Sequence, residues 1–165
     1  MVKKVISGGQ TGIDRMGLEV AQSLGYETGG CAPKKFMTEN GEDTTLKFHF
    51  GLREVSDDEL TEFKKLTQKD DRYTARTYIN ARDSDGTVYF SSDNFSPGSK
   101  TTKRACQMFN KPFIMNPNID SLTAFINDNN IETLNVAGNR GSKLNRRDSS
   151  NFWRILYETL KALKE

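Results

Sequence analysis

The sequence of 165 residues contains one histidine and only two cysteines. Zinc sites are built from several histidine and cysteine ligands, so this composition argues against a zinc site. The cysteines, Cys31 and Cys106, lie far apart and do not form a disulfide framework. We therefore expect two free thiols in a reducing compartment. The histidine, His49, lies between Phe48 and Phe50, which is more typical of a packed side chain than of a catalytic base.

Long hydrophobic runs are also absent. No apolar stretch approaches the roughly 20 residues of a membrane-spanning helix, and the apolar stretch near the N-terminus is too short for a secretory signal. We therefore expect a cytoplasmic protein, in the host cytoplasm if the chain is viral. The net charge of +2 is too small to indicate a nucleic-acid or membrane partner. With 35% hydrophobic and 28% charged residues, the chain is typical of one globular domain over residues 1–165.

Short apolar runs alternate with helical patterns along the chain. Five runs predict strands, at residues 2–7, 28–32, 87–91, 113–115 and 133–137. Helices are predicted at residues 14–24, 56–66, 73–81, 100–109, 119–128 and 151–164. A charged insert of loop and helix is predicted at 34–70, with mostly loop up to residue 56. The alternation predicts a three-layer α/β domain whose mostly parallel sheet has about five or more strands.

Three loops follow predicted strands and are rich in small polar and basic residues: 7–15, 91–102 and 137–143. Ligands of such sheets bind beyond the carboxyl ends of the strands. The first loop reads SGGQTGIDR. Its glycines Gly8, Gly9 and Gly12 let backbone amides approach a ligand, and the start of the following helix is a natural anion site.

Side chains of the first loop add further binding groups. Ser7 and Thr11 offer hydroxyls, Gln10 can contact a base or a sugar, and Arg15 can hold a phosphate. The loop is not a P-loop, because Ile13 stands where that motif has lysine. It supplies only half of a dinucleotide-binding fingerprint. A tight turn that merely starts a helix is the alternative interpretation.

The second loop contains the sequence PGSKTTKR. Its first two residues predict a turn, and the hydroxyls and lysine that follow predict a helix start and a second candidate anion site. We expect Ser99 or Thr101 to be the N-cap of that helix. In the third loop, Arg140 lies between two glycines directly after a buried strand. This position suits a ligand better than the core.

A fourth stretch, RTYINARDSDG, contains both arginine and carboxylates. Arg76, Asn80 and Asp83 share one face of the predicted helix, and Ser84 and Asp85 follow in the turn. These groups could perform acid–base chemistry or hold Mg²⁺. A solvated helix end is the alternative.

Several motifs in order resemble the molybdenum-carrier family: SGGQTG with Asp14 and Arg15, GCAPK at 30–34, Arg76 and Thr77 with Asn80, DSDGT at 83–87, and NVAG at 135–138 with Arg140. That family is similar to the SLOG superfamily of Rossmann-like nucleotide-binding proteins. The superfamily includes the cytokinin-activating phosphoribohydrolases, which are often mislabelled as lysine decarboxylases. The resemblance covers nearly the whole chain. It implies a Rossmann-like fold and a site formed by these loops for a nucleotide or nucleotide-derived ligand.

One departure from the resemblance bears on catalysis. The phosphoribohydrolases have a catalytic glutamate after their glycine-rich loop, whereas Lys103 and Arg104 follow the comparable loop here. A cation favours phosphate binding but cannot act as the carboxylate that hydrolysis needs. The sequence therefore favours a binding protein over an enzyme.

We expect the backbone amides of residues 8–12 and 98–102 to contact phosphates, with Arg15 and Arg140 as clamps. Such a protein would sense or sequester a nucleotide signal, for example as a viral sponge for a cyclic or ADP-ribose-type immune signal. The predicted ligand-binding residues are Ser7, Gly8, Gly9, Gln10, Thr11, Gly12, Asp14, Arg15, Arg76, Asn80, Ser84, Asp85, Gly98, Ser99, Lys100, Thr101, Thr102 and Arg140.

Two alternative functions use the same loops. One is a nucleotide N-glycosidase or phosphohydrolase with Asp14 or Asp85 as the catalytic carboxylate. The other is a carrier of molybdopterin or its molybdenum cofactor, whose phosphate and pterin suit the same groups. A homodimer or higher homo-oligomer is a further expectation, because Trp153 and Tyr157 could extend the apolar face of the last helix. The alternative is that both aromatic side chains pack on the sheet.

Overall fold

The computed structural model describes residues 1–165 except for the side chain of Arg72. A five-stranded sheet forms its centre, in the order β2-β1-β9-β7-β8, and every pairing within it is parallel. The strands are β1 (Lys4–Ile6), β2 (Glu27–Gly29), β7 (Gly86–Phe90), β8 (Phe113–Met115) and β9 (Thr133–Gly138). The predicted α/β class with a parallel sheet is therefore confirmed. β9, the last strand in the sequence, is central in space.

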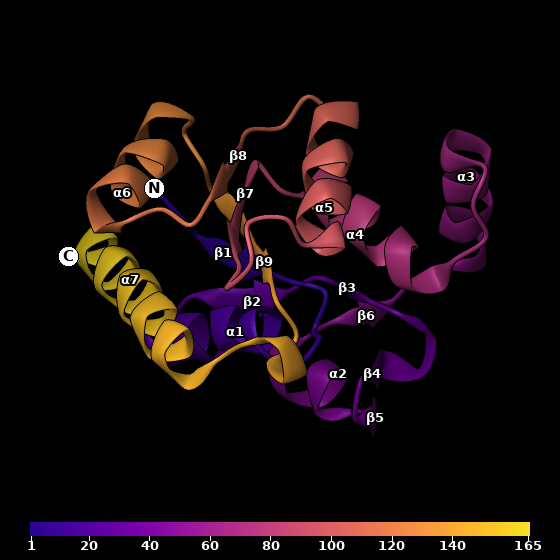
Figure 1. The fold of residues 1–165 in the computed structure, drawn as a ribbon, viewed down its shortest axis with the longest axis horizontal. Coiled ribbons are helices and arrows are strands. Elements are labelled where there is room, and N and C mark those ends of the chain that lie inside the picture. Colours follow the sequence, from indigo (N-terminus) through magenta and orange to yellow (C-terminus); the bar gives the residue numbers. More distant parts are fainter.

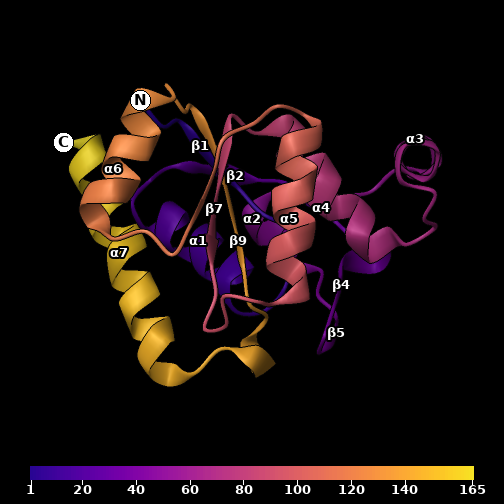
Figure 2. The same ribbon diagram turned by 45° about the horizontal axis from the view of Figure 1, so that its top comes forward.

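Helices cover both faces of the sheet (Figure 1, Figure 2). One face carries α1 (Ile13–Ser23), α6 (Ile119–Asp128) and α7 (Arg146–Lys164). The other carries α4 (Arg72–Asp83) and α5 (Pro97–Met108), with α3 (Asp57–Thr67) outside α4. This is the three-layer arrangement that the alternating pattern predicts.

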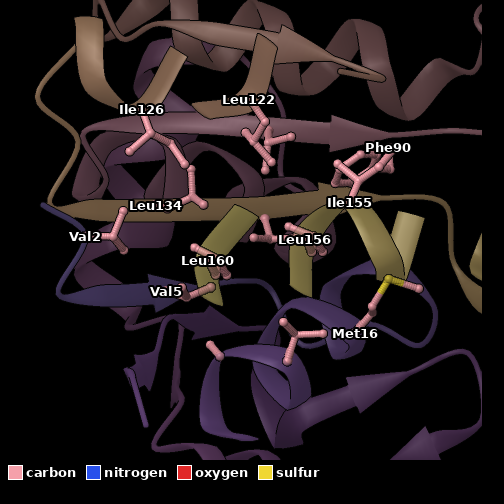
Figure 3. Packing of buried hydrophobic residues seen from close by; sticks show 14 of the residues in the cluster. Val2, Val5, Met16, Phe90, Leu122, Ile126, Leu134, Ile155, Leu156 and Leu160 are labelled. Carbon is pink, nitrogen blue, oxygen red and sulfur yellow. The ribbon is translucent and has the colours of Figure 1, made fainter. Parts of the chain in front are cut away.

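The larger core lies between the sheet and the first of these helix layers. Figure 3 shows Leu156 and Leu160 of α7 directed toward Val5 of β1 and Leu134 of β9, and all four side chains are fully buried. α7 begins at Arg146, five residues before the predicted start, because the side chain of Asn145 caps it. Burial of this apolar stripe fixes α7 on the sheet.

The two aromatic residues of α7 behave differently from the rest of the helix. Trp153 is 45% exposed and stacks on Tyr157, with 4.7 Å between ring centroids. Tyr157 is half-buried and packs against the core, whereas Trp153 does not. The alternative expectation that both aromatic side chains pack on the sheet is therefore wrong for Trp153.

The insert at 34–70 contains more structure than predicted. Besides α3, it holds η1 (Lys34–Phe36), β4 (Met37–Thr38), β5 (Gly41–Glu42), α2 (Thr45–Phe50) and β6 (Arg53–Glu54). α2 buries Leu46 and Phe50 in a small separate core with Leu18 of α1. The prediction of mostly loop is wrong here, because elements of two to six residues give no readable periodicity.

An ion-pair network attaches α3 to the body of the domain. Glu59 of α3 accepts hydrogen bonds from Arg53 at 2.6 Å and from Arg82 of α4 at 2.9 Å. These donors lower the pKa of Glu59 to about 2. A capping box is present at the start of α3, with Ser56 and Glu59 bonded to each other's backbone N–H groups.

Two predicted elements begin or end differently from expectation. α5 starts at Pro97, and its N-cap is Ser96 rather than Ser99 or Thr101, because proline suits the first helical position. The predicted strand at 28–32 is divided at Gly30 into β2 and β3 (Cys31–Ala32). Gly30 has a φ of +124°, and a Cβ there would lie 2.1 Å from the Ser7 carbonyl oxygen.

Within the described part of the chain, no helix is both long and apolar enough to cross a membrane.

Candidate functional site

A cavity of about 690 Å³ opens at the carboxyl ends of β1, β7 and β9. Residues from the β1–α1 turn, α4, the β7–α5 loop and the loop after β9 surround it. Predicted site residues in its lining are Gly8, Gln10, Asp14, Arg76, Asn80, Gly98, Thr101, Thr102 and Arg140. The structure thus brings together half of the predicted set, from segments far apart in the sequence.

A carboxylate and a guanidinium lie together in this lining. Asp14 Oδ2 lies 3.7 Å from Arg76 Nη1, and the Asp14 side chain is only 6% exposed. Both groups crowd Gly8, where a Cβ would lie 2.4 Å from Arg76 Nη1 and 3.1 Å from Asp14 Oδ2. Glycine at position 8 therefore makes room for the pair.

Burial dominates the electrostatics of this carboxylate. It raises the pKa of Asp14 to about 6, although the nearby charge of Arg76 and the backbone N–H of Gln10 both favour the ionised form. A carboxyl group with such a pKa can hold or release a proton near neutral pH. Perturbed carboxyl groups in a cavity are typical of functional sites.

Arg76 has unusual freedom to bind. Among the described residues it makes no hydrogen bond within the usual distance, and its Nε is buried without a partner. Its side chain is 16% exposed, and its Cζ lies 5.9 Å from the centroid of the Tyr73 ring. A guanidinium carries five N–H donors. Arg76 can therefore donate several hydrogen bonds to an anionic ligand without breaking any that exist.

The β1–α1 turn is less available than its glycines suggest. Gly9 N–H donates to Ser7 Oγ at 3.2 Å, Gln10 N–H to Asp14 Oδ2 at 3.3 Å, and Thr11 N–H to the Gln10 side chain at 3.0 Å. The first helical amide, at Ile13, donates to the Asn139 carbonyl at 3.0 Å. The expectation that the amides of residues 8–12 contact a phosphate is therefore wrong for Gly9, Gln10 and Thr11. The helix start at Ile13 is not open to a ligand either.

The start of α5 keeps one open donor, the N–H of Gly98. Ser96 Oγ accepts the N–H of Ser99, and Pro97 has no N–H. Gly98 lines the cavity, and its N–H lies in the first helical turn, where no intrahelical acceptor exists. A Cβ on Gly98 would lie 2.7 Å from the Tyr89 hydroxyl, so glycine keeps this wall open.

Two more cations lie at the loop that follows β9. Arg140 and Lys143 both line the cavity. Arg140 is half-exposed, and its Nε lies 3.6 Å from Glu39 Oε2. Glu39 also accepts hydrogen bonds from Thr11 and Ser142, which anchors this loop to the first turn. Together with Arg76 these groups give the cavity an excess of positive charge over its carboxylates, Asp14 and Asp93.

The structure places two predicted residues at the wrong edge of the sheet. Ser84 and Asp85 precede β7 and therefore lie at the amino ends of the strands. Asp85 Oδ2 accepts the N–H groups of Glu132 and Thr133, and Ser84 is buried with its hydroxyl bonded to Ala81. Asp85 is thus a structural acceptor at a turn, remote from the cavity, and its predicted catalytic or ribose-binding role is not supported.

Other predicted residues lie beside the cavity but do not line it. Arg15 is paired with Asp43 of the insert, and Lys100 is exposed on the outer side of α5. The remaining ones are buried or packed within the loops: Ser7, Gly9, Thr11, Gly12 and Ser99. Asn80 lines the cavity, yet its amide group exchanges two hydrogen bonds with the backbone of Cys31 at 2.8 and 2.9 Å. We therefore assign Asn80 to the support of β3.

Residues that the sequence did not single out complete the lining. They include Tyr73 and Thr74 at the start of α4, Tyr89 at the end of β7, and Asp93, Ser96, Asn139 and Lys143 in the loops. A signal for Tyr89 was available, since it lies near the carboxyl end of a strand. Tyr73 offered none, because its position depends on how α4 packs against α5.

Comparison with known proteins identifies the family. Residues 5–155 match the profile of the Circularly permutated YpsA SLOG family. The chain belongs to this family. The SLOG protein is also similar to a crystal structure of a protein from Syntrophus aciditrophicus SB named "Putative molybdenum carrier protein". The two chains share 27% sequence identity with a TM-score of 0.72, and the match covers 99% of this chain and 96% of the other. No curated protein shows a significant match to this chain.

The described residues hold no group of three or more histidine, cysteine, aspartate or glutamate side chains placed to bind a metal ion. Both cysteines are free and buried, and burial raises the pKa of the Cys31 thiol to about 12. A nucleophilic thiolate at Cys31 is therefore disfavoured.

Proposed function

We propose that this SLOG protein binds a phosphate-bearing nucleotide or nucleotide-derived molecule in the cavity. The observation that carries the proposal is Arg76, a largely buried guanidinium in the cavity wall without a hydrogen-bond partner among the described residues. Leaving such donors unbonded is costly, and an anionic ligand would satisfy them. The open start of α5 and the cations Arg140 and Lys143 support the same ligand chemistry.

Binding without turnover is the form of the proposal that the site chemistry favours. Lys103 and Arg104 of α5 stand where the resemblance to phosphoribohydrolases would require a glutamate, and neither residue lines the cavity. A protein of this kind would sense or sequester its ligand, for example a cyclic or ADP-ribose-type signal.

The test is a ligand panel read by mass spectrometry. Purified protein is incubated with mononucleotides, dinucleotides and cyclic or ADP-ribose-type signals, and both the bound fraction and the supernatant are analysed. We expect an intact phosphate-bearing ligand in the denatured bound fraction of the wild type and its loss in Arg76→Ala. Equal retention by Arg76→Ala would contradict the proposal. Arg15→Ala, which removes a cation outside the cavity lining, is the matched control.

Asp14 supports one alternative function. Its raised pKa of about 6 would let it protonate a leaving group as a general acid in an N-glycosidase or phosphohydrolase. The same supernatants distinguish this alternative, since turnover would release free base or phosphate, and Asp14→Asn would abolish the release.

The name of the Syntrophus protein supports a second alternative, a carrier of molybdenum. Its cargo here would be molybdopterin or the molybdenum cofactor. The volume and positive charge of the cavity suit a phosphate-bearing pterin as well as a nucleotide. Recovery of molybdopterin from protein purified from a producing host would favour it.

A further inference from the structure

The β1–α1 turn has the glycines and the helix start of an anion-binding turn, yet it already holds an anion of its own. Asp14 lies in the first turn of α1, and its carboxylate accepts the Gln10 N–H and faces Arg76. In a phosphate-binding turn, a ligand oxygen would accept these donors. Asp14 thus occupies the position that the pattern SGGQTG predicts for a ligand phosphate.

Several elements surround this carboxylate. Arg76 faces it from α4, and the backbones of Gly8 and Gly138 approach it from the β1–α1 turn and from β9. Tyr89 of β7 lines the same cavity and feels the charge of Asp14. The remaining charged groups in the cavity lining are Asp93, Arg140 and Lys143. Asp14 is therefore the carboxylate in direct contact with Arg76. A second anion bound at the turn would lie close to the Asp14 carboxylate.

Two like charges in a buried site repel strongly. An ionised carboxylate also has only acceptor capacity, so its remaining lone pairs suit a hydroxyl or amine donor. We propose that Asp14 is a resident anion that excludes phosphate from the β1–α1 turn and receives a donor group of the ligand, such as a ribose hydroxyl. The phosphate of the ligand then lies on the side of Arg76 away from the turn. This inference rests on the proposed function and assigns an orientation to the ligand within that site.

The first measurement uses sulfate, a phosphate-shaped dianion whose charge is constant between pH 5 and pH 8. Sulfate is titrated into ¹⁵N-labelled protein while the amide signals of Gln10 and Gly98 are followed. At pH 8 we expect sulfate to shift Gly98 and leave Gln10 unaffected in the wild type. In Asp14→Ala the turn is free, and we expect sulfate to shift Gln10 with at least about tenfold higher affinity at this position than in the wild type.

The pH dependence of the wild type gives the same test without a substitution. Protonation of Asp14 as the pH falls through about 6 removes the repulsion, so sulfate affinity in the cavity should rise between pH 8 and pH 5. Asp93→Asn removes another carboxylate of the same cavity and should keep this pH dependence, whereas Asp14→Asn should lose it. A wild type whose Gln10 signal responds to sulfate at pH 8 as strongly as that of Asp14→Ala would overturn the inference.

The second measurement examines the donor group. AMP and 2′,3′-dideoxy-AMP have the same phosphate and base but differ in the ribose hydroxyls. A hydrogen bond to a charged acceptor contributes enough for roughly a tenfold to hundredfold difference in the wild type, and Asp14→Ala should reduce this difference. Equal affinity of the wild type for both nucleotides would overturn the inference while leaving phosphate binding intact. Absence of both sulfate and AMP from the cavity in every variant would instead contradict the proposed function and, with it, the inference.

Discussion

The turn after β1 and the loop after β7 both lead from a parallel strand into a helix, and both contain glycine, serine and threonine. They differ in what happens to their backbone donors. In the first turn, side chains of the same segment accept the amides, and the Asp14 carboxylate occupies the centre. In the second, a serine caps the helix from outside and the Gly98 N–H stays open to the cavity. Glycine and hydroxyl content therefore does not identify an anion site until the acceptors of each amide are known.

The largest effect should come from a substitution that breaks the first turn. Gly12 has a φ of +83° and a ψ of −128°, and a Cβ there would lie 2.3 Å from the Asn139 carbonyl oxygen. We expect Gly12→Ala to lower the free energy of unfolding by about 4 kcal/mol, from backbone strain and overpacking together. Urea unfolding measures it. Gly41→Ala, with a φ of +103° but open space around the Cβ, should cost only about 1 to 2 kcal/mol. If both substitutions lowered the free energy of unfolding equally, the close contact of Gly12 with residues 139–141 would not contribute to the loss.

The next effect concerns the buried carboxylate of that turn. The pKa of Asp14 is raised from 3.8 to about 6 in the folded protein, so the folded state binds this proton more tightly than the unfolded chain. The stability that this proton contributes is complete below about pH 4 and is lost as the pH rises through about 6, with a difference of about 3 kcal/mol. We expect the stability difference between Asp14→Asn and the wild type to shift by this amount in favour of the variant from pH 3 to pH 7. Urea midpoints at each pH measure the shift, and parallel curves for the two proteins would show that Asp14 titrates normally.

A third change distinguishes the two arginines nearest the first turn. Arg76 lines the cavity with its donors open, whereas Arg15 is paired with Asp43 beside it. Arg76→Ala should weaken binding of the ligand found in the panel by about 2 to 3 kcal/mol, or roughly 30- to 150-fold. Arg15→Ala should change the dissociation constant less than about threefold. Isothermal titration calorimetry measures both, and a larger loss in Arg15→Ala would restore Arg15 as the phosphate clamp that the sequence predicts.

The smallest effect examines the second loop. Ser96→Ala removes the N-cap of α5 and should lower stability by about 1 kcal/mol. It should also weaken ligand binding, because the Gly98 N–H lies in the turn that the cap holds. Ser56→Ala removes the same kind of cap from α3, which lies outside the cavity. If both variants lose similar stability but only Ser96→Ala loses ligand affinity, the start of α5 is part of the site.

Much of the fold could be predicted from the sequence, because strands and helices of ordinary length show their periodicity. The strand at 113–115 and the helix at 119–128 are predicted to the residue. Clustering of the strand-end loops also follows from a parallel sheet alone. The position of Asp85 could have been predicted correctly. A residue directly before a strand lies at the amino edge of a parallel sheet, opposite the site. Tyr73 and the pairing of Arg15 with Asp43 depend on tertiary packing, which no local pattern encodes.

The central position of β9 has a consequence for how the chain is made. β9 pairs with both β1 and β7, although it is the last strand to be synthesised. Until residues 133–138 leave the ribosome, the central sheet can form only as two separate strand pairs, β1 with β2 and β7 with β8. The apolar edges of Val5 and Val88 then stay uncovered on the nascent chain. Ribosomes that stall before residue 133 would therefore release aggregation-prone fragments, while completion of β9 joins both halves in one late step.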